Sequence, residues 1–269
     1  MNIVQINPKI ISIAENTEGS LENKLNSLVN KNTWMTEWRQ LAQRFQLFKF
    51  AKMNEEESKT YEWDTVIIES LIRDTIENVK KHINLDNDLK ITIVPALPFP
   101  WFEKLDQSTW VNGFTNGIGN IIIAVPPNPD EDFLKYMIAH EAHHSSPDNP
   151  IYKLTFDTFT LAEWYKMEGT AEYFSLSLYS DTRWWKSSFT KEIERNYWSE
   201  ARNHLNTTND QLKSRLCFGD PKSGIPYLAG YAFAYNMVNT YVQNHSIQAL
   251  YELFSVEPEK YAEAYEKSR

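Results

Sequence analysis

The sequence predicts an α+β protein that is mostly α-helical and contains a small antiparallel or mixed sheet. Three observations support this fold class: apolar residues at helical spacing in the first third of the chain, short β-branched segments near its middle, and helical patterns again in the second half. Of the 269 residues, 42% are hydrophobic and 23% are charged, which is typical of a folded globular chain.

The N-terminal part of the chain is expected to be helical, because apolar residues recur every three or four positions over residues 20–85. A large apolar stripe on one helix face consists of Trp34, Trp38, Leu41, Phe45 and Phe48. Core packing explains such a stripe better than ligand contact does. The pattern changes near residue 87, so we expect a helical N-terminal region over 1–87 and a second domain over 88–269.

The second domain is expected to begin with strands and to continue with helices. Strands are predicted at 90–95 and 119–125, where short β-branched runs meet proline or glycine turn signals. A helix over 129–145 is expected to start at Asn128 as N-cap, with Pro129 at its first position and Glu131 completing a capping box. Further helices are expected at about 161–179 and 226–244.

The helix over 129–145 ends in a pattern that indicates a metal site, His140-Glu141-Ala142-His143-His144, which matches H-E-x-x-H. His140 and His144 are four residues apart, so their imidazoles project from one helix face and can reach a single zinc ion. Glu141 lies beside that face, where it can act as general base on a zinc-bound water. His143 points about 100° away from the pair, which favours a surface or hydrogen-bonding role.

A third ligand is needed, because catalytic zinc sites usually have three protein ligands. The next predicted helix contains Glu168-Gly169-Thr170-Ala171-Glu172, in which two carboxylates four residues apart share one face. One carboxylate can bind zinc and the other can support it. An alternative in which Glu172 is the ligand would be aspzincin-like, and it requires Asp where this chain has Glu.

The two motifs resemble those of the gluzincin metallopeptidases, such as thermolysin and the zinc aminopeptidases, over about residues 120–179. HEAHH, EGTAEYF and a later Gly230-Tyr231 are also similar to a bacterial domain family of unknown function described as predicted zinc-dependent proteases. The resemblance implies a zincin-like domain whose sheet packs on the HExxH helix. It also implies Glu168 as metal ligand and Glu172 as the acidic group that orients a histidine ligand.

The reaction that this resemblance implies is peptide hydrolysis, with a peptide or protein as substrate. The strand at 119–125 is expected to offer an exposed edge to an extended peptide. Tyr231 resembles the tyrosine that gluzincins place opposite the metal, which implies a role in stabilising the transition state. Its competitors for that role are Tyr227, Tyr235, His204 and His245. The alternative role for Tyr231 is packing within its helix. No aminopeptidase motif precedes HEAHH, so endopeptidase and exopeptidase action both stay open.

Two other classes of protein are compatible with parts of the pattern. A catalytically inactive, zinc-stabilised binding or regulatory protein would keep the ligands, but the intact Glu141 argues against it. A di-iron carboxylate protein would need a second Glu-x-x-His pair besides Glu141 and His144, and the sequence contains none that we identify.

Charge and cysteine content limit partners and location. The net charge is −9, and Lys and Arg form no strong basic block, so nucleic acid is not expected as a partner. The single cysteine, Cys217, cannot form an internal disulfide and is expected to be a buried thiol. The N-terminus does not resemble a signal peptide and no segment is apolar enough to span a membrane, so the expected location is cytoplasmic.

Overall fold

The computed structural model describes residues 1–9, 11, 25, 37–99, 102–150 and 158–269. The chain divides into two compact units, Met1–Pro147 and Asp148–Arg269. The division expected near residue 87 falls inside the first unit and stays a prediction. Part of the expected N-terminal helical span, Trp34 included, lies outside the described residues.

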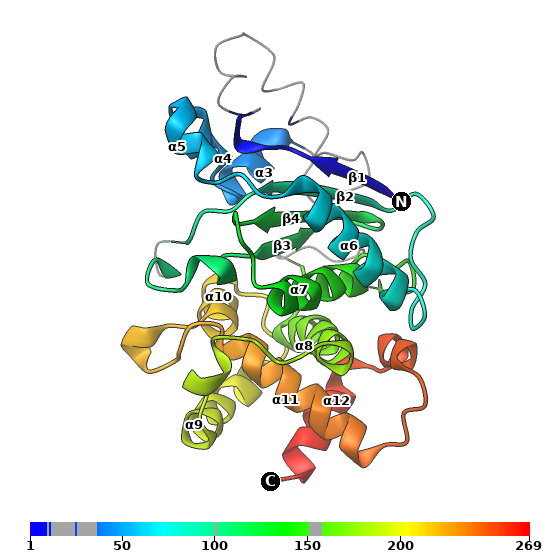
Figure 1. Cartoon of the computed structure of the whole chain (residues 1–269). Helices are drawn as coiled ribbons and strands as arrows, with labels where there is room; N and C mark the ends of the chain where they lie inside the picture. The colour runs from blue at the N-terminus through cyan, green and yellow to red at the C-terminus, as the bar shows by residue number, and fades with distance from the viewer. Residues whose placement is uncertain (10, 12–24, 26–36, 100–101, 151–157) are drawn as a thin grey trace. The chain divides into compact units, whose positions relative to one another are not determined.

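The first unit contains a mixed four-stranded sheet, which confirms the predicted α+β class (Figure 1). Its strands are β1 (Asn2–Gln5), β2 (Lys90–Pro95), β3 (Asn112–Thr115) and β4 (Asn120–Val125). The order is β1-β2-β4-β3; β1, β2 and β4 are parallel, and β3 runs antiparallel to β4. The strands predicted at 90–95 and 119–125 correspond to β2 and β4, while β1 and β3 were not individually predicted.

The expected substrate edge on the strand at 119–125 is wrong. β4 is central, because it pairs with β2 along one side and with β3 along the other. All six of its residues are buried, which is typical of an interior strand covered on both faces. The edge strands of this sheet are β1 and β3.

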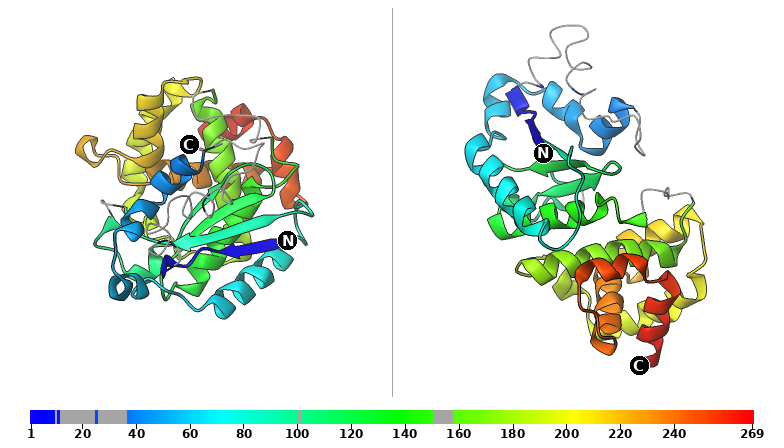
Figure 2. Two further views of the ribbon diagram at one scale, coloured as in Figure 1. Left: turned by 90° about the horizontal axis from the view of Figure 1, so that it is seen from above. Right: turned by 90° about the vertical axis from the view of Figure 1, so that its right-hand side faces the viewer.

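Helices cover both faces of the sheet (Figure 2). Between residues 37 and 89, the structure contains the helices α3 (Trp38–Arg44), α4 (Leu47–Ala51), α5 (Glu55–Lys59) and α6 (Thr65–Val79). Leu41 and Phe45 are buried in one core cluster with Ile122 of β4, while Phe48 is 38% exposed. Leu41 and Phe45 therefore pack in the core, as the apolar stripe predicts, whereas Phe48 does not.

The motif helix, α7 (Glu131–His144), packs against α6, β3 and β4. It starts two residues later than the sequence predicts, because Asp130 is the N-cap: its side chain accepts a hydrogen bond from the Phe133 amide at 2.8 Å. The Asp130 amide is held by the Ser108 carbonyl at 3.0 Å, which fixes the entry to the helix. The expected N-cap at Asn128 is therefore wrong.

The second unit is helical. Its helices are α8 (Leu161–Leu178), α9 (Lys191–Ala201), α10 (Asp210–Phe218), α11 (Ala229–Asn244) and α12 (Pro258–Lys267). α8 and α11 pack closely, because Gly169 leaves no side chain where a Cβ would meet the Ala234 carbonyl oxygen. The helix expected at 161–179 matches α8, which starts with a capping box between Thr160 and Glu163.

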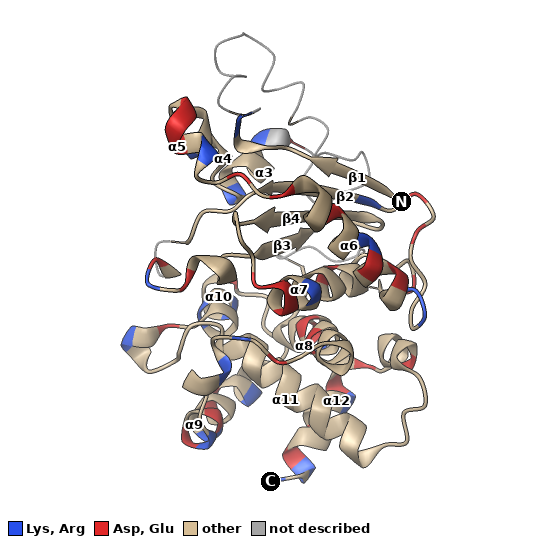
Figure 3. Ribbon diagram, in the orientation of Figure 1, with Lys and Arg blue, Asp and Glu red and all other residues tan. Residues whose placement is uncertain are grey.

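Charged residues along several helices form local ion pairs, and basic and acidic segments are interspersed on the ribbon (Figure 3). Examples are Lys59–Glu55 on α5, Arg73–Glu69 on α6 and Lys191–Glu194 on α9. Among the described residues, no helix is both long and apolar enough to cross a membrane. The cytoplasmic location and the exclusion of nucleic acid stay predictions.

Candidate metal centre

His140 and His144 lie together near the end of α7. Their side chains meet at the Nε2 atoms, which are 3.0 Å apart, and the ring centroids are 4.7 Å apart with the planes at 82°. The two residues are only 5% and 8% exposed. The helical repeat brings them together, since residues four positions apart are stacked one turn above another.

This histidine pair fits a zinc ion. Zinc binds imidazole nitrogen at about 2.0–2.1 Å. Because that bond length exceeds half of the 3.0 Å that separates the Nε2 atoms, one ion can lie at bonding distance from both. The pair can therefore supply two of the ligands that a catalytic zinc site needs.

Glu141 is held by β3, a contact that the sequence analysis missed. Thr115 Oγ1 lies 2.8 Å from Glu141 Oε2 and 2.8 Å from the Glu141 carbonyl oxygen. A Cβ at Gly113 would overlap Glu141 Cγ, so only glycine leaves room for this carboxylate in its present position. Glu141 and Thr115 are 6% and 5% exposed.

The register of β3 explains why these two residues meet Glu141. Side chains alternate along a strand, so Gly113 and Thr115 face one side and Phe114 faces the other, where it packs on the cluster beneath α3 and α4. Gly113 pairs with Ile123 and Thr115 with Ile121 of β4. A glycine inside a strand often marks a close approach, and that was the available signal for this contact.

His143 is fully buried, so the surface role considered for it is wrong. Its ring centroid is 6.2 Å from that of His144, and the planes are at 73°. The alternative hydrogen-bonding role stays a prediction.

In the second unit, Glu168 lies midway along α8 and is 7% exposed. Glu172, one turn later on the same face, is fully buried. The neighbouring Gly169 makes the close contact with α11 described above, which fixes this stretch of α8. Both carboxylates are therefore held on a well-packed segment of helix.

Glu172 has a buried cationic partner, Arg183. Arg183 Nη1 donates to Glu172 Oε2 at 2.7 Å, and the exposed fractions of the two side chains are 4% and 1%. The same guanidinium donates to both carboxylate oxygens of Asp181, at 2.9 and 3.1 Å, and lies 4.7 Å from the centroid of the Tyr235 ring. Arg183 thus offsets the charge of Glu172 and links it to the loop that follows α8.

Tyr231, the expected transition-state donor, lies in the first turn of α11. Its ring packs edge-on against Trp164 of α8, with centroids 5.1 Å apart and planes at 81°. Trp164 precedes Glu168 by one turn on α8, so Tyr231 approaches the same helix face as Glu168. The ring packing is thereby established, while a role for the hydroxyl stays a prediction.

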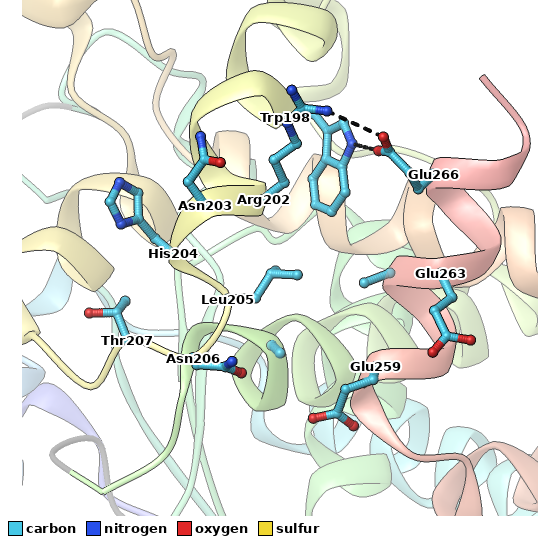
Figure 4. A pocket seen from close by; sticks show the side chains of 12 residues that line it. Trp198, Arg202, Asn203, His204, Leu205, Asn206, Thr207, Glu259, Glu263 and Glu266 are labelled. Carbon is cyan, nitrogen blue, oxygen red and sulfur yellow. Dashed lines mark hydrogen bonds and ion pairs between the residues drawn. The ribbon is translucent and has the colours of Figure 1, made fainter.

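Two of the competing donors have other contacts. Tyr235 stacks on Tyr173 with centroids 6.4 Å apart, and the Tyr241 carbonyl lies 2.8 Å from His245 Nδ1. His204 lines a pocket of about 690 Å³ between α9 and α12 (Figure 4). The residues that line this pocket include none of Glu168, Glu172 and Tyr231.

Cys217 is fully buried near the end of α10, as expected for an inert thiol. Burial raises its pKa well above the usual range, and the Glu168 carboxylate raises it further. The thiol is therefore neutral at physiological pH, and the Glu168 charge acts close to this end of α10.

Most of the chain matches a known protein family. A family model described as "Predicted Zn-dependent protease (DUF2268)" matches residues 68–263. The chain belongs to this family. The match runs from α6 through α12 and covers the H-E-x-x-H helix and Glu168. The family's description agrees with the metal-binding capacity of the His140 and His144 imidazoles. No curated protein and no solved structure matches the chain.

Proposed function

We propose that this protein is a zinc-dependent peptidase of the gluzincin type, in which His140, His144 and Glu168 bind the zinc ion and Glu141 is the general base. The observation that carries the proposal is the end of α7, where two Nε2 atoms lie 3.0 Å apart and the intervening carboxylate is fixed by Thr115. A metal-binding pair with an adjacent, buried, positioned base is the arrangement that hydrolysis by an activated water requires.

Glu168 is preferred over Glu172 as the third ligand. Glu172 already accepts a hydrogen bond from a buried guanidinium, which offsets the negative charge that a ligand would direct at the metal. A carboxylate held in this way is better suited to orient a neighbouring group than to bind the ion. Glu172 is therefore proposed as the supporting acid.

In the proposed reaction, zinc would lower the pKa of a water molecule and polarise the carbonyl of the scissile peptide bond. Glu141 takes one proton from the attacking water. The water oxygen bonds to the carbonyl carbon, the C–N bond breaks, and Glu141 returns the proton to the leaving amine. Thr115 holds Glu141 in place, and Tyr231 donates a hydrogen bond to the oxyanion.

Metal content and hydrolysis, measured on the same preparations, test this proposal. Wild-type protein should carry one zinc per chain and cleave a peptide mixture until a chelator is added. His140→Ala, His144→Ala and Glu168→Ala should each lose most of the zinc, whereas Glu172→Ala should lose about 10–100-fold in affinity or activity. His82→Ala, an exposed histidine after α6, is the matched control and should keep the metal.

Two outcomes would count against the proposal. Full zinc occupancy in one of the three ligand variants would remove that residue from the ligand set. A wild-type protein that binds zinc but cleaves no peptide would indicate the inactive, zinc-stabilised binding protein instead.

A further inference from the structure

Three aromatic rings from separate helices meet in the second unit: Trp164 of α8, Phe218 at the end of α10 and Tyr231 of α11. We call them the aromatic platform. The Trp164 centroid lies 5.1 Å from that of Tyr231 and 6.2 Å from that of Phe218, and the Phe218 and Tyr231 centroids are 6.4 Å apart. Each ring therefore contacts the other two at distances typical of aromatic pairs.

The three rings of the platform differ in their exposure to solvent. Trp164 is 2% exposed, Tyr231 is half-buried, and Phe218 is 41% exposed. Tyr227, nine residues after Phe218, is also exposed, at 39%. Contiguous exposed apolar surface often marks an interaction site or a ligand-binding groove.

The chain between α10 and α11 is shaped to bring the platform together. Gly219 ends α10 with φ +97°, and the Leu228 amide then donates to the Phe218 carbonyl at 2.9 Å. Leu228 itself has φ +57°, a left-handed conformation that few non-glycine residues adopt. Such conformations persist where the surrounding structure enforces them, and they concentrate at functional sites.

A second glycine sets the distance between the two helices. A Cβ at Gly230 would overlap the Cys217 carbonyl oxygen, so only glycine lets α11 start against the end of α10. This close approach places Tyr231 beside Phe218. The Gly230-Tyr231 pair is thus explained by the geometry of the platform, whatever the role of the tyrosine hydroxyl.

The platform lies beside Glu168, the proposed third ligand. Trp164 and Glu168 are four residues apart on α8 and share one face. Trp164 therefore places the platform on the face of α8 that carries Glu168.

From this geometry we propose that the aromatic platform receives an apolar side chain of the peptide substrate, aromatic or long aliphatic, next to the scissile bond. The inference rests on the proposed peptidase function and adds the substrate class. Phe218 has no polar side-chain atom. An apolar substrate side chain that covers this ring therefore removes apolar surface of both the ring and the substrate from water. The buried Trp164 packs edge-on against the Phe218 ring, with the planes at 76°.

Cleavage-site profiling of wild type and Phe218→Ala on one peptide mixture gives the first test. Wild type should prefer Phe, Leu or Met at one position next to the cleaved bond. In Phe218→Ala, kcat/KM for such peptides should fall about 10-fold or more relative to peptides with Ala at that position. Tyr251→Ala, which removes an aromatic ring that is 56% exposed elsewhere in the same unit, should leave the profile unchanged.

A binding measurement keeps the inference testable without turnover. NMR titration of the Glu141→Gln protein with three blocked tripeptides, whose central residue is Phe, Ala or Lys, should show the tightest binding for Phe. Phe218→Ala in the same background should remove that preference, and circular dichroism should confirm that the variant is folded.

The failures of the two proposals are distinguishable. Cleavage and tripeptide preferences that are unchanged by Phe218→Ala would overturn the platform while leaving the peptidase intact. A preference for Lys over Phe would also overturn it. Phe-selective binding that depends on Phe218, without cleavage of any peptide by wild type, would support the platform and contradict the peptidase.

Discussion

Thr115 Oγ1 lies 2.8 Å from Glu141 Oε2 and equally far from the Glu141 carbonyl oxygen. The hydroxyl has one proton, so it donates to one of the two oxygens at a time. With the carboxylate ionised, donation to Oε2 is favoured because hydrogen bonds to charged groups are stronger. An antiparallel edge strand thereby orients the proposed general base on α7.

Thr115→Val should keep the shape of the side chain and remove this hydrogen bond. We expect zinc content to stay near wild type while kcat falls about 10–100-fold, because the base is no longer held in its productive position. The lost bond to a buried carboxylate should also lower the free energy of unfolding by about 1.5–3 kcal/mol. Thr115→Ser should restore most of the activity, and a Thr115→Val protein with wild-type kcat would show that the contact is only structural.

Gly113→Ala should act through the same carboxylate, because the added methyl group occupies the space of Glu141 Cγ. The expected result is a fall in kcat of about 100-fold. In the Glu141→Gln background the same substitution should cause little further loss, since effects of residues that act as one unit are not additive. Independent, additive losses would contradict a shared mechanism.

Arg183→Ala should destabilise the second unit more than any exposed arginine variant. It leaves the buried Glu172 charge uncompensated, which typically costs about 3–5 kcal/mol in the free energy of unfolding. Arg73→Ala breaks an exposed pair with Glu69 and should cost about 0.2–1 kcal/mol. Denaturant unfolding of both variants checks the difference, and equal losses would mean that Glu172 does not depend on Arg183.

Asp181 should make the stability of the second unit dependent on pH. Partial burial acts to raise its pKa, but the hydrogen bond and charge of Arg183, with Lys186, outweigh burial, so the pKa lies below its reference value of 3.8. A lowered carboxylate pKa contributes stability above about pH 3.8, and that contribution is lost as the pH falls through the folded-state value. The stability difference between wild type and Asp181→Asn should therefore be constant from pH 5 to 8 and shrink below about pH 4. A difference that grows in acid would have the wrong sign for this account.

The helices with the ligand motifs could be predicted from sequence, because their signals are local. Residues four apart on one helix must share a face, so His140 with His144, and Glu168 with Glu172, follow from α-helical geometry alone. The start of α7 could not be predicted as well. Asn128 and Asp130 both suit an N-cap, and the hydrogen bond from the Asp130 amide to Ser108 decides between them.

The contacts that orient the site are non-local, so hydrophobic periodicity does not predict them, and Gly113 is only a general signal of a close approach. β3 is only four residues long and includes a glycine, so neither periodicity nor β-propensity marks it. The contact of Thr115 with Glu141 depends on the register between β3 and β4. The pairing of Arg183 with Glu172 joins a loop to a helix across eleven positions of the chain.

The central claim is that Glu141 acts on the attacking water and is not a metal ligand, and zinc content together with turnover of Glu141→Gln tests it most directly. The amide keeps the size and polarity of the side chain but cannot take a proton. We predict one zinc per chain, a folded protein and a fall in kcat of about 10²–10⁴-fold. Glu131→Gln, an exposed position in the first turn of the same helix, should match wild type in both measurements. Loss of zinc from Glu141→Gln would make the glutamate a ligand, and retention of both zinc and hydrolysis would mean that another group takes the proton; either result would contradict the account.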